Sequence, residues 1–185
     1  MVSTKVVIGG IPGVGKTTVL GNLVNAGLTV ENFGDIMLKQ AVSKGYVNDR
    51  DEMRKMPPKL QLEIQKGAAD YFSKKKSVII DTHLSIKTTS GFLPGIPWHI
   101  LEILKPDLIV SLEADPHDIF LRRANDSTRS RDSDSEDDIQ AHLEINRMYG
   151  VSYSAMSGCP FMIVKNRTGM ANEASKEILA AILRK

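Results

Sequence analysis

The feature that most constrains this chain is a glycine-rich segment near its start, which reads Gly-Ile-Pro-Gly-Val-Gly-Lys-Thr from Gly10 to Thr17. It matches the pattern of Gly, any four residues, Gly, Lys, and Ser or Thr, which binds phosphate when it joins a strand to a helix. Apolar residues at 5–9 predict a strand before it, and residues 16–26 have the pattern of a helix after it. We therefore interpret the segment as a phosphate-binding loop.

Each part of this loop has an expected role. Backbone N–H groups from about Gly13 to Thr18 can point into one concavity, where the positive end of the following helix adds to their attraction for phosphate. Lys16 is expected to reach the β and γ phosphates of a nucleoside triphosphate, and the Thr17 hydroxyl to bind Mg²⁺. The residues predicted to hold the triphosphate are Gly10, Ile11, Pro12, Gly13, Val14, Gly15, Lys16, Thr17 and Thr18.

Apolar segments alternate with helical patterns along the rest of the chain. Strands are predicted at 6–8, 28–33, 77–80, 107–112 and 160–164. Helices are predicted at 16–26, 34–44, 49–56, 58–75, 97–104, 116–125, 135–158 and 170–183. The alternation predicts an α/β fold, the three-layer arrangement of phosphate-loop NTPases, in which a five-stranded parallel sheet has helices on both faces.

The composition predicts one soluble domain that spans residues 1–185. Apolar residues make up 42% and charged residues 25% of the chain, and it has no run of about 18 apolar residues that could span a membrane. The net charge of +2 indicates no nucleic-acid partner. Because the first strand follows almost directly on Met1, we expect no targeting segment and a cytoplasmic location.

Two segments interrupt the alternation of strands and helices. Residues 82–97 are rich in Thr, Ser, Gly and Pro, and we predict a functional loop there. Residues 122–138 contain four arginines followed by an acidic run, which predicts a charged flap. Within this flap, Ser133 and Glu136 have the spacing of a capping box that opens the next helix.

Polar residues at the ends of the apolar strands are the first candidates for a site. Ligands of open α/β sheets bind at the carboxyl ends of the strands, and Asp81 directly follows the apolar run at 78–80. Its carboxylate is expected to help hold Mg²⁺, directly or through water. Asp107 and Asp115 flank another apolar strand, and we expect both to be caps.

Arginines are the expected clamps for the phosphates, because a guanidinium binds phosphate through two parallel hydrogen bonds and stays charged. Arg129 and Arg131 lie two residues apart, so an extended segment could direct both toward one phosphate cluster. The acidic residues that follow them allow a second interpretation, in which these arginines form ion pairs on the surface.

Six further segments, together with the phosphate-binding loop, make the chain resemble the archaeal-type adenylate kinases over nearly its full length. They are Asn32-Phe-Gly-Asp-Ile-Met, Asp49-Arg-Asp-Glu-Met-Arg-Lys-Met, Ile80-Asp-Thr-His, Thr88-x-x-Gly-Phe-Leu-Pro-Gly-Ile-Pro, Leu112-Glu-Ala-Asp and Asp126-Ser-Thr-Arg-Ser-Arg-Asp. The resemblance implies one kinase domain with an AMP-binding flap at about 33–75, a short lid at about 125–137, and a homotrimer.

The resemblance also implies a reaction, the reversible transfer of the γ-phosphoryl group of MgATP to AMP, giving two ADP and maintaining the balance of adenine nucleotides. His83 is expected to position groups through a hydrogen bond rather than to act as a base. The implied AMP-binding residues are Gly34, Asp35, Arg54, Asp81, Thr82 and His83, with Arg54 on the AMP phosphate. The implied catalytic residues are Lys16, Arg123, Arg129, Arg131 and Arg147, and the implied metal ligands are Thr17 and Asp81.

Two other classes of protein remain open at this point. Another small-substrate kinase, such as a cytidylate or shikimate kinase, would use the same phosphate chemistry with a different acceptor. A GTPase switch would carry an Asn-Lys-x-Asp motif, whereas the chain has Lys165-Asn-Arg-Thr168 after its last strand and lacks the aspartate.

Overall fold

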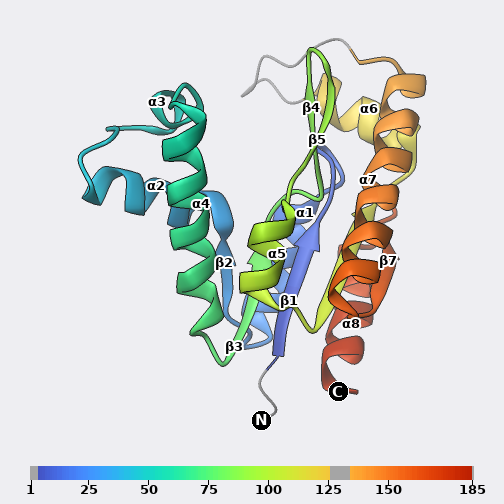
Figure 1. The fold of residues 1–185 in the computed structure, drawn as a ribbon. Helices are drawn as coiled ribbons and strands as arrows, with labels where there is room; N and C mark the ends of the chain where they lie inside the picture. The colour runs from blue at the N-terminus through green and yellow to red at the C-terminus, as the bar shows by residue number, and fades with distance from the viewer. Residues whose placement is uncertain (1–3, 126–133, 185) are drawn as a thin grey trace.

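A five-stranded parallel sheet forms the centre of the molecule. The computed structural model describes residues 4–125 and 134–184, and its strand order is β2-β3-β1-β6-β7 (Figure 1). The strands are β1 (Thr4–Gly9), β2 (Val30–Asn32), β3 (Ser77–Asp81), β6 (Leu108–Glu113) and β7 (Phe161–Lys165). All neighbouring strands of this sheet are parallel, which confirms the predicted sheet.

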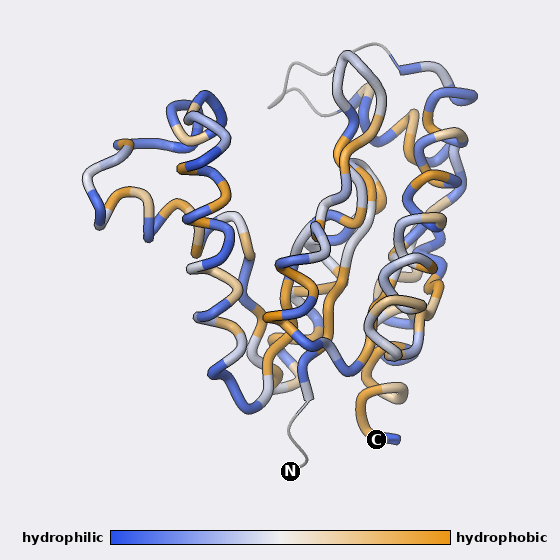
Figure 2. The backbone as a smooth tube through the Cα atoms, in the orientation of Figure 1, coloured by the Kyte–Doolittle hydropathy of each residue, from blue (hydrophilic) through white to orange (hydrophobic). Residues whose placement is uncertain are grey.

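Alternation along the strands divides the core between the two faces of the sheet. Val6 and Ile8 of β1 pack on one face with helices α1 (Lys16–Asn25) and α8 (Ala171–Leu183). Val7 packs on the other face with α4 (Pro58–Ser73) and α5 (Trp98–Leu104). In Figure 2 the hydrophobic residues accordingly follow the strands and the sides of the helices that face them. The predicted three-layer α/β fold is confirmed.

The remaining helices are α2 (Phe33–Ser43), α3 (Arg50–Arg54), α6 (Pro116–Ala124) and α7 (Glu136–Ser157). Together with α4, helices α2 and α3 enclose a small core of their own, made of Ala41, Val47, Met53, Met56 and Ile64. Each helix agrees with its predicted range to within two residues at either end. This agreement follows from local signals, such as the Asp115 carboxylate, which accepts the His117 N–H and caps α6 as predicted.

The predicted loop at 82–97 is wrong over much of its length. Strands β4 (Ser85–Thr88) and β5 (Gly91–Pro94) form an antiparallel hairpin there. The hairpin is held by α7, whose Tyr149 hydroxyl donates to the Phe92 carbonyl at 3.0 Å and whose Asn146 accepts from the Ser85 hydroxyl at 3.0 Å. Four-residue strands have little periodicity, and these stabilising contacts come from residues more than 50 positions away.

Two predicted caps are also corrected. Helix α7 begins at Glu136, and its capping box pairs Ser135 with Asp138, not Ser133 with Glu136. Both pairs consist of a serine and an acidic residue three positions later, so the sequence could not distinguish them and the predicted pair was the wrong one. Asp107 is the cap of no described helix; its carboxylate accepts the Lys5 N–H at 2.7 Å and so joins the start of β6 to β1.

The described ends of α6 and α7 shorten the predicted flap at 122–138, because α6 continues to Ala124 and α7 begins at Glu136. Among the helices that the structure describes, none has the length and apolarity needed to cross a membrane.

Candidate active site

The phosphate-binding loop joins β1 to α1 at the carboxyl edge of the sheet, as the sequence predicts. Gly13 and Gly15 have φ angles of 92° and 84°, a region that residues with side chains rarely adopt. Between them Val14 is buried, and its N–H donates to the Ile11 carbonyl at 3.4 Å. Alternation of left-handed and other conformations curves a backbone into a concave nest of N–H groups.

Lys16 lies beside the end of the neighbouring strand. Its ammonium group donates to the Thr82 carbonyl at 2.7 Å and forms an ion pair with Asp81 at 2.6 Å. This contact follows from the sheet, because the register of β1 and β3 pairs Ile8 with Asp81, and the Thr82 N–H donates to the Ile8 carbonyl. The structure therefore brings together three predicted site residues from two segments that are distant in the sequence.

His83 follows these residues. Loss of hydration is the main cause that lowers the pKa of His83 to about 4, and the nearby Lys16 cation acts in the same direction. His83 is nevertheless an exposed residue, and its hydration opposes so large a shift. Because the pKa is lowered from 6.5, the imidazole is mostly neutral at pH 7 and can position groups through a hydrogen bond without adding a charge.

Asn32 connects the residues predicted to bind AMP, and the sequence analysis missed it. Its amide donates to Asp81 at 2.7 Å, and its carbonyl oxygen accepts the Asp35 N–H at 3.1 Å and so caps α2. Gly34 lies against the same side chain, since a Cβ there would be 3.2 Å from Asn32 Oδ1. The signal that could have revealed this residue is a capping residue directly after an apolar strand.

Arg54 is not brought into contact with the other predicted AMP-binding residues. It extends from α3, which lies beside the start of α4 (Figure 1), and it pairs with Asp51 at 2.8 Å. Its side chain is 69% exposed. Arg50, which the sequence analysis assigned to no site, pairs instead with Asp35.

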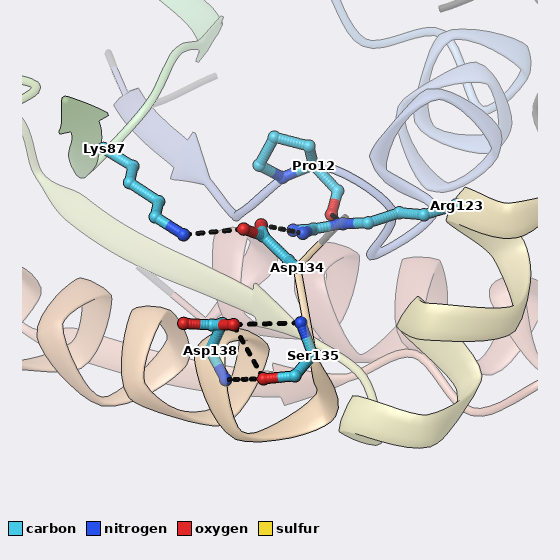
Figure 3. Close-up of polar contacts among 6 residues, drawn as sticks. All are labelled: Pro12, Lys87, Arg123, Asp134, Ser135 and Asp138. Carbon is cyan, nitrogen blue, oxygen red and sulfur yellow. Dashed lines mark hydrogen bonds and ion pairs between the residues drawn. The ribbon is translucent and has the colours of Figure 1, made fainter. Parts of the chain in front are cut away.

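Arg123 faces the phosphate-binding loop from the end of α6. Its Nε donates to the Pro12 carbonyl at 2.9 Å, and its Nη1 pairs with Asp134 at 2.7 Å. Asp134 also accepts from Lys87 of the hairpin at 2.6 Å, so one carboxylate lies between two cations (Figure 3). The side chain of Arg123 is only 10% exposed.

Arg147 forms both of its fork contacts with Glu113, a residue at the end of β6 that the sequence analysis did not single out. Its Nε and Nη2 atoms donate to the two carboxylate oxygens at 2.7 and 2.6 Å, and Lys165 adds a contact at 2.8 Å. Burial alone would raise the pKa of Glu113, but the hydrogen bonds from Arg147 and Lys165 outweigh it and lower that pKa. Glu113 is fully buried, and its contacts with the two cations keep it charged.

A pocket of about 430 Å³ opens next to the phosphate-binding loop. Arg122 forms one wall and donates to the Thr168 hydroxyl at 2.8 Å. The sequence pattern assigned no ligand to the 166–169 segment, whose residues lie far along the chain from the loop that they face. The residues that line the pocket are Gly15, Thr18, Asn22, Arg122, Asn166, Arg167, Thr168, Gly169, Ala171 and Asn172.

Thr17 and Asp81 provide the oxygen ligands that Mg²⁺ prefers, a hydroxyl and a carboxylate. Thr17 is exposed at the start of α1, and Asp81 lies at the loop through its ion pair with Lys16. These residues fit a magnesium ion that obtains its other ligands from phosphates and water. Arg129 and Arg131, the remaining predicted clamps, lie outside the described residues, as does most of the predicted lid.

Comparison with known proteins places this geometry in context. A family model described as an AAA domain matches residues 9–140. A protein named adenylate kinase from Methanothermobacter thermautotrophicus is 44% identical over 181 residues, which cover 96% of this chain and 98% of that protein. Adenylate kinase from Methanocaldococcus jannaschii is 39% identical over 98% of this chain and 100% of its own length.

Solved structures add a likeness of fold alone. A shikimate kinase from Acinetobacter baumannii in complex with shikimate superposes with a TM-score of 0.63 at 18% identity, over 98% of this chain and 93% of that one. A shikimate kinase from Bacteroides thetaiotaomicron also gives a TM-score of 0.63, at 10% identity, over 97% of this chain and 98% of that one.

Proposed function

The chain belongs to the adenylate kinase family, which transfers the γ-phosphoryl group of ATP reversibly to AMP to give two ADP, and we propose how its residues divide that work. The observation that carries the proposal is the position of Lys16, whose ammonium group joins the phosphate-binding loop to Asp81 and Thr82. One cation thus lies at the boundary between two halves of a site. A phosphoryl group that moves from one nucleotide to the other must cross this boundary.

In this proposal the ATP half consists of the loop from Gly10 to Thr18 and the adjoining pocket. Its N–H groups and Lys16 hold the β and γ phosphates, while the pocket beside Arg122 has room for the ribose and base. When bound, Mg²⁺ neutralises charge on the β and γ phosphates, and Thr17 and Asp81 would hold it. The family resemblance adds Arg129 and Arg131 as clamps from the lid.

The AMP half is proposed to consist of Gly34, Asp35 and Arg54 with Asp81, Thr82 and His83. Its support is the set of contacts around Asn32, which links α2 to Asp81 and hence to Lys16. Arg54 supplies a guanidinium on this side that is exposed and engaged only with Asp51 among the contacts described for it. Such a group can exchange its partner for a phosphate at little cost.

The chemistry needs no side-chain base of unusual basicity. The nucleophile is a phosphate oxygen of AMP, which is already ionised at pH 7, so catalysis consists of positioning and charge neutralisation. Lys16 and the arginines supply the positive charge, and the neutral His83 supplies a hydrogen bond. In the proposed catalytic arrangement, Arg147 shares its charge between the transferred phosphoryl group and Glu113.

Acceptor specificity is the direct test. Purified protein is supplied with MgATP and, separately, with AMP, CMP, UMP or shikimate, and ADP formation is followed. We expect rapid turnover with AMP and at most slow turnover with the others. Rapid turnover with CMP or shikimate but not with AMP would overturn the assignment of the acceptor half and favour one of the other small-substrate kinases.

We also propose that the enzyme is a cytoplasmic homotrimer, which rests on the family resemblance. Two large apolar side chains on α7, Met148 and Val151, are 62% and 55% exposed and are available for a contact between copies. Sedimentation should then give a mass near three times the chain mass of 20.4 kDa. A mass of 20.4 kDa at micromolar protein would contradict the trimer.

A further inference from the structure

Three side chains from outside the phosphate-binding loop donate hydrogen bonds to three successive carbonyl groups within it. Two come from the end of α6 and one from the segment after β7. The contacts are Arg123 Nε to Pro12 O at 2.9 Å, Arg122 Nη1 to Gly13 O at 3.4 Å, and Asn166 Nδ2 to Val14 O at 2.7 Å. The two outer contacts are short, and the middle one is long and therefore weak.

These contacts determine where the N–H groups of the loop point. A peptide unit is planar and trans, so the N–H of one residue points opposite to the carbonyl of the residue before it. Fixing the Pro12 carbonyl therefore fixes the N–H of Gly13, and fixing the Val14 carbonyl fixes the N–H of Gly15. Gly13 and Gly15 are the two residues of the loop with positive φ angles, where the backbone turns its N–H groups into the nest.

Asn166 has little freedom to leave this position. The residue is 4% exposed, and its own N–H donates to the carbonyl of the fully buried Glu113 at 2.7 Å. Gly15 packs directly against its amide, since a Cβ on Gly15 would lie 2.4 Å from Asn166 Nδ2. The carbonyl at the end of β6 thus fixes the backbone of Asn166, and the side-chain amide of Asn166 fixes the loop at Val14.

The arrangement has a cost that packing alone does not explain. The Oδ1 atom of Asn166 is buried and has no hydrogen-bond partner among the described residues. A buried acceptor without a partner destabilises a folded protein, so such a group in a native structure requires an explanation. An apolar residue of similar size would avoid this cost but could not donate to Val14.

The second short contact is braced in a similar way. Arg123 Nη1 is held by Asp134, and the other oxygen of that carboxylate accepts from Lys87, as Figure 3 shows. Arg123 therefore reaches Pro12 with its guanidinium already anchored to the hairpin and to the start of α7.

We propose that Asn166 is a positioning residue that holds the phosphate-binding loop in its phosphate-accepting conformation, with Arg123 in the same role at the other side of the loop. This inference rests on the proposed assignment of Gly10 to Thr18 to the ATP phosphates. Asn166 acts through the Val14 peptide and contributes to the binding of the triphosphate, not to the binding of AMP.

Inorganic tripolyphosphate is a suitable probe, because it has the charges of ATP without the base and ribose that the adjoining pocket would contact. Its dissociation constant is measured by calorimetry for the wild-type protein and for Asn166→Ala and Asn166→Asp. We expect each variant to bind tripolyphosphate roughly 3 to 10 times more weakly, the loss of one hydrogen bond. The KM for ATP should rise by a similar factor, while the KM for AMP stays within about twofold.

Asn25→Asp is the matched control. Asn25 is exposed at the last position of α1, at the opposite end of that helix from the loop, and it does not line the pocket. It should bind tripolyphosphate as the wild type does although it adds the same negative charge as Asn166→Asp, while Asn166→Ala removes the donor without adding a charge. A purely structural role for Asn166 predicts lower thermal stability with unchanged tripolyphosphate binding in the folded variants.

The outcomes separate the two proposals. If the wild-type protein does not bind tripolyphosphate, the assignment of the loop to ATP fails. If the wild type binds it and Asn166→Ala binds it equally well, only the role of Asn166 fails. Should both variants fail to fold, hydrogen exchange in the wild-type protein decides, because the Asn166 Nδ2 protons should exchange slowly with water, and fast exchange contradicts the bond to Val14.

Discussion

The two halves of the proposed site are built in opposite ways. In the ATP half, the charged groups pair with partners that have little exposure to solvent. Glu113, which pairs with Arg147 and Lys165, is fully buried, and the side chains of Arg123 and Asp134 are 10% and 15% exposed. In the AMP half, the arginines form ion pairs on the surface, where the side chains of Arg50 and Arg54 are 44% and 69% exposed. The helices that carry them pack around a small core of their own.

This difference has an energetic meaning. An exposed ion pair contributes about 0 to 1 kcal/mol, whereas removal of one partner from a buried pair costs about 3 to 5 kcal/mol. The ATP half is therefore fixed before it meets its ligand, while the AMP half can exchange charged partners freely. Segments that move on ligand binding are drawn from the less stable parts of a protein, so we expect the α2 to α4 region to move and the loop to stay.

The largest expected effect comes from removing the cation at the boundary of the two halves. Lys16→Ala should lower kcat by at least about 100-fold to 1000-fold, the cost of one group that stabilises charge in the transition state. The fold should persist, since Lys16 contacts only Asp81 and the Thr82 carbonyl among its described polar contacts. A coupled assay of ADP formation and a thermal melt measure both effects.

Lys176→Ala is the control for that experiment, because Lys176 is exposed on α8, away from the loop. It should keep wild-type activity. Activity near that of the wild type in Lys16→Ala would contradict the central role given to this lysine.

The next effect tests whether the ATP half is held by its buried charges. Glu113→Gln removes the carboxylate that holds Arg147 and Lys165 and should lower the free energy of unfolding by about 3 kcal/mol. We expect the low end of the range for buried pairs because both cations are partly exposed. Urea unfolding measures the change. Glu144→Gln, on the exposed part of the same helix as Arg147, should change stability by less than about 0.5 kcal/mol.

A pH experiment tests the packing of the hairpin on α7 through His142, which is 5% exposed and packs against Phe92 of the hairpin with ring centroids 5.0 Å apart. Burial is the main cause that lowers the pKa of His142 to about 4, and Arg123 and Lys87 act in the same direction. Because the pKa of an unfolded histidine is near 6.5, the unfolded state binds the proton first as the pH falls.

The stability that neutral His142 contributes is thus complete above about pH 6.5 and is lost as the pH falls toward 4. Wild-type protein should lose up to about 3 kcal/mol more than His142→Gln across this window, measured by urea unfolding at several pH values. His117→Gln is a control of opposite sign, since the Glu136 hydrogen bond raises the pKa of His117 and any stability from that pair is lost as the pH rises. Parallel stability curves for the wild type and His142→Gln would show that His142 is not buried.

In the ATP half, the sequence predicted the phosphate-binding loop but not the residues that hold it in place. The glycine pattern and the apolar strands determined the loop, Lys16 and Asp81, because each of these follows from local spacing and from the direction of parallel strands. Glu113 and Asn166 were missed although Glu113 is the last residue of β6 and Asn166 directly follows β7. Their roles depend on contacts with α7 and with the loop, which are distant in sequence.

In the AMP half, the sequence predicted the helices but not the contacts between them. Its helices were predicted to within two residues, since prolines and caps mark their ends. The contact of Asn32 with Asp35 is such a local cap, but its contact with Asp81 joins residues 49 positions apart and could not be predicted from spacing. The hairpin at 85–94 was predicted as a loop for a related reason, because its stabilising contacts come from α7. Local patterns in the sequence thus predicted the helices and strands, whereas the contacts between them became known only from the structure.

The smallest expected effect on the fold, and the sharpest contrast with Glu113, is expected from Arg54. Arg54→Ala should change the free energy of unfolding by less than about 0.5 kcal/mol, because it removes only an exposed ion pair with Asp51. The KM for AMP should nevertheless rise at least about tenfold, the value of a charge-assisted hydrogen bond to phosphate, with the KM for ATP unchanged. Asp51→Ala removes the same ion pair and leaves the guanidinium in place, so it should keep the wild-type KM for AMP.

If both variants raise this KM equally, the ion pair itself orders α3 for AMP, and the AMP half is as fixed as the ATP half. If only Arg54→Ala raises it, the arginine is held loosely until the phosphate arrives, which is the difference between the two halves in a single residue.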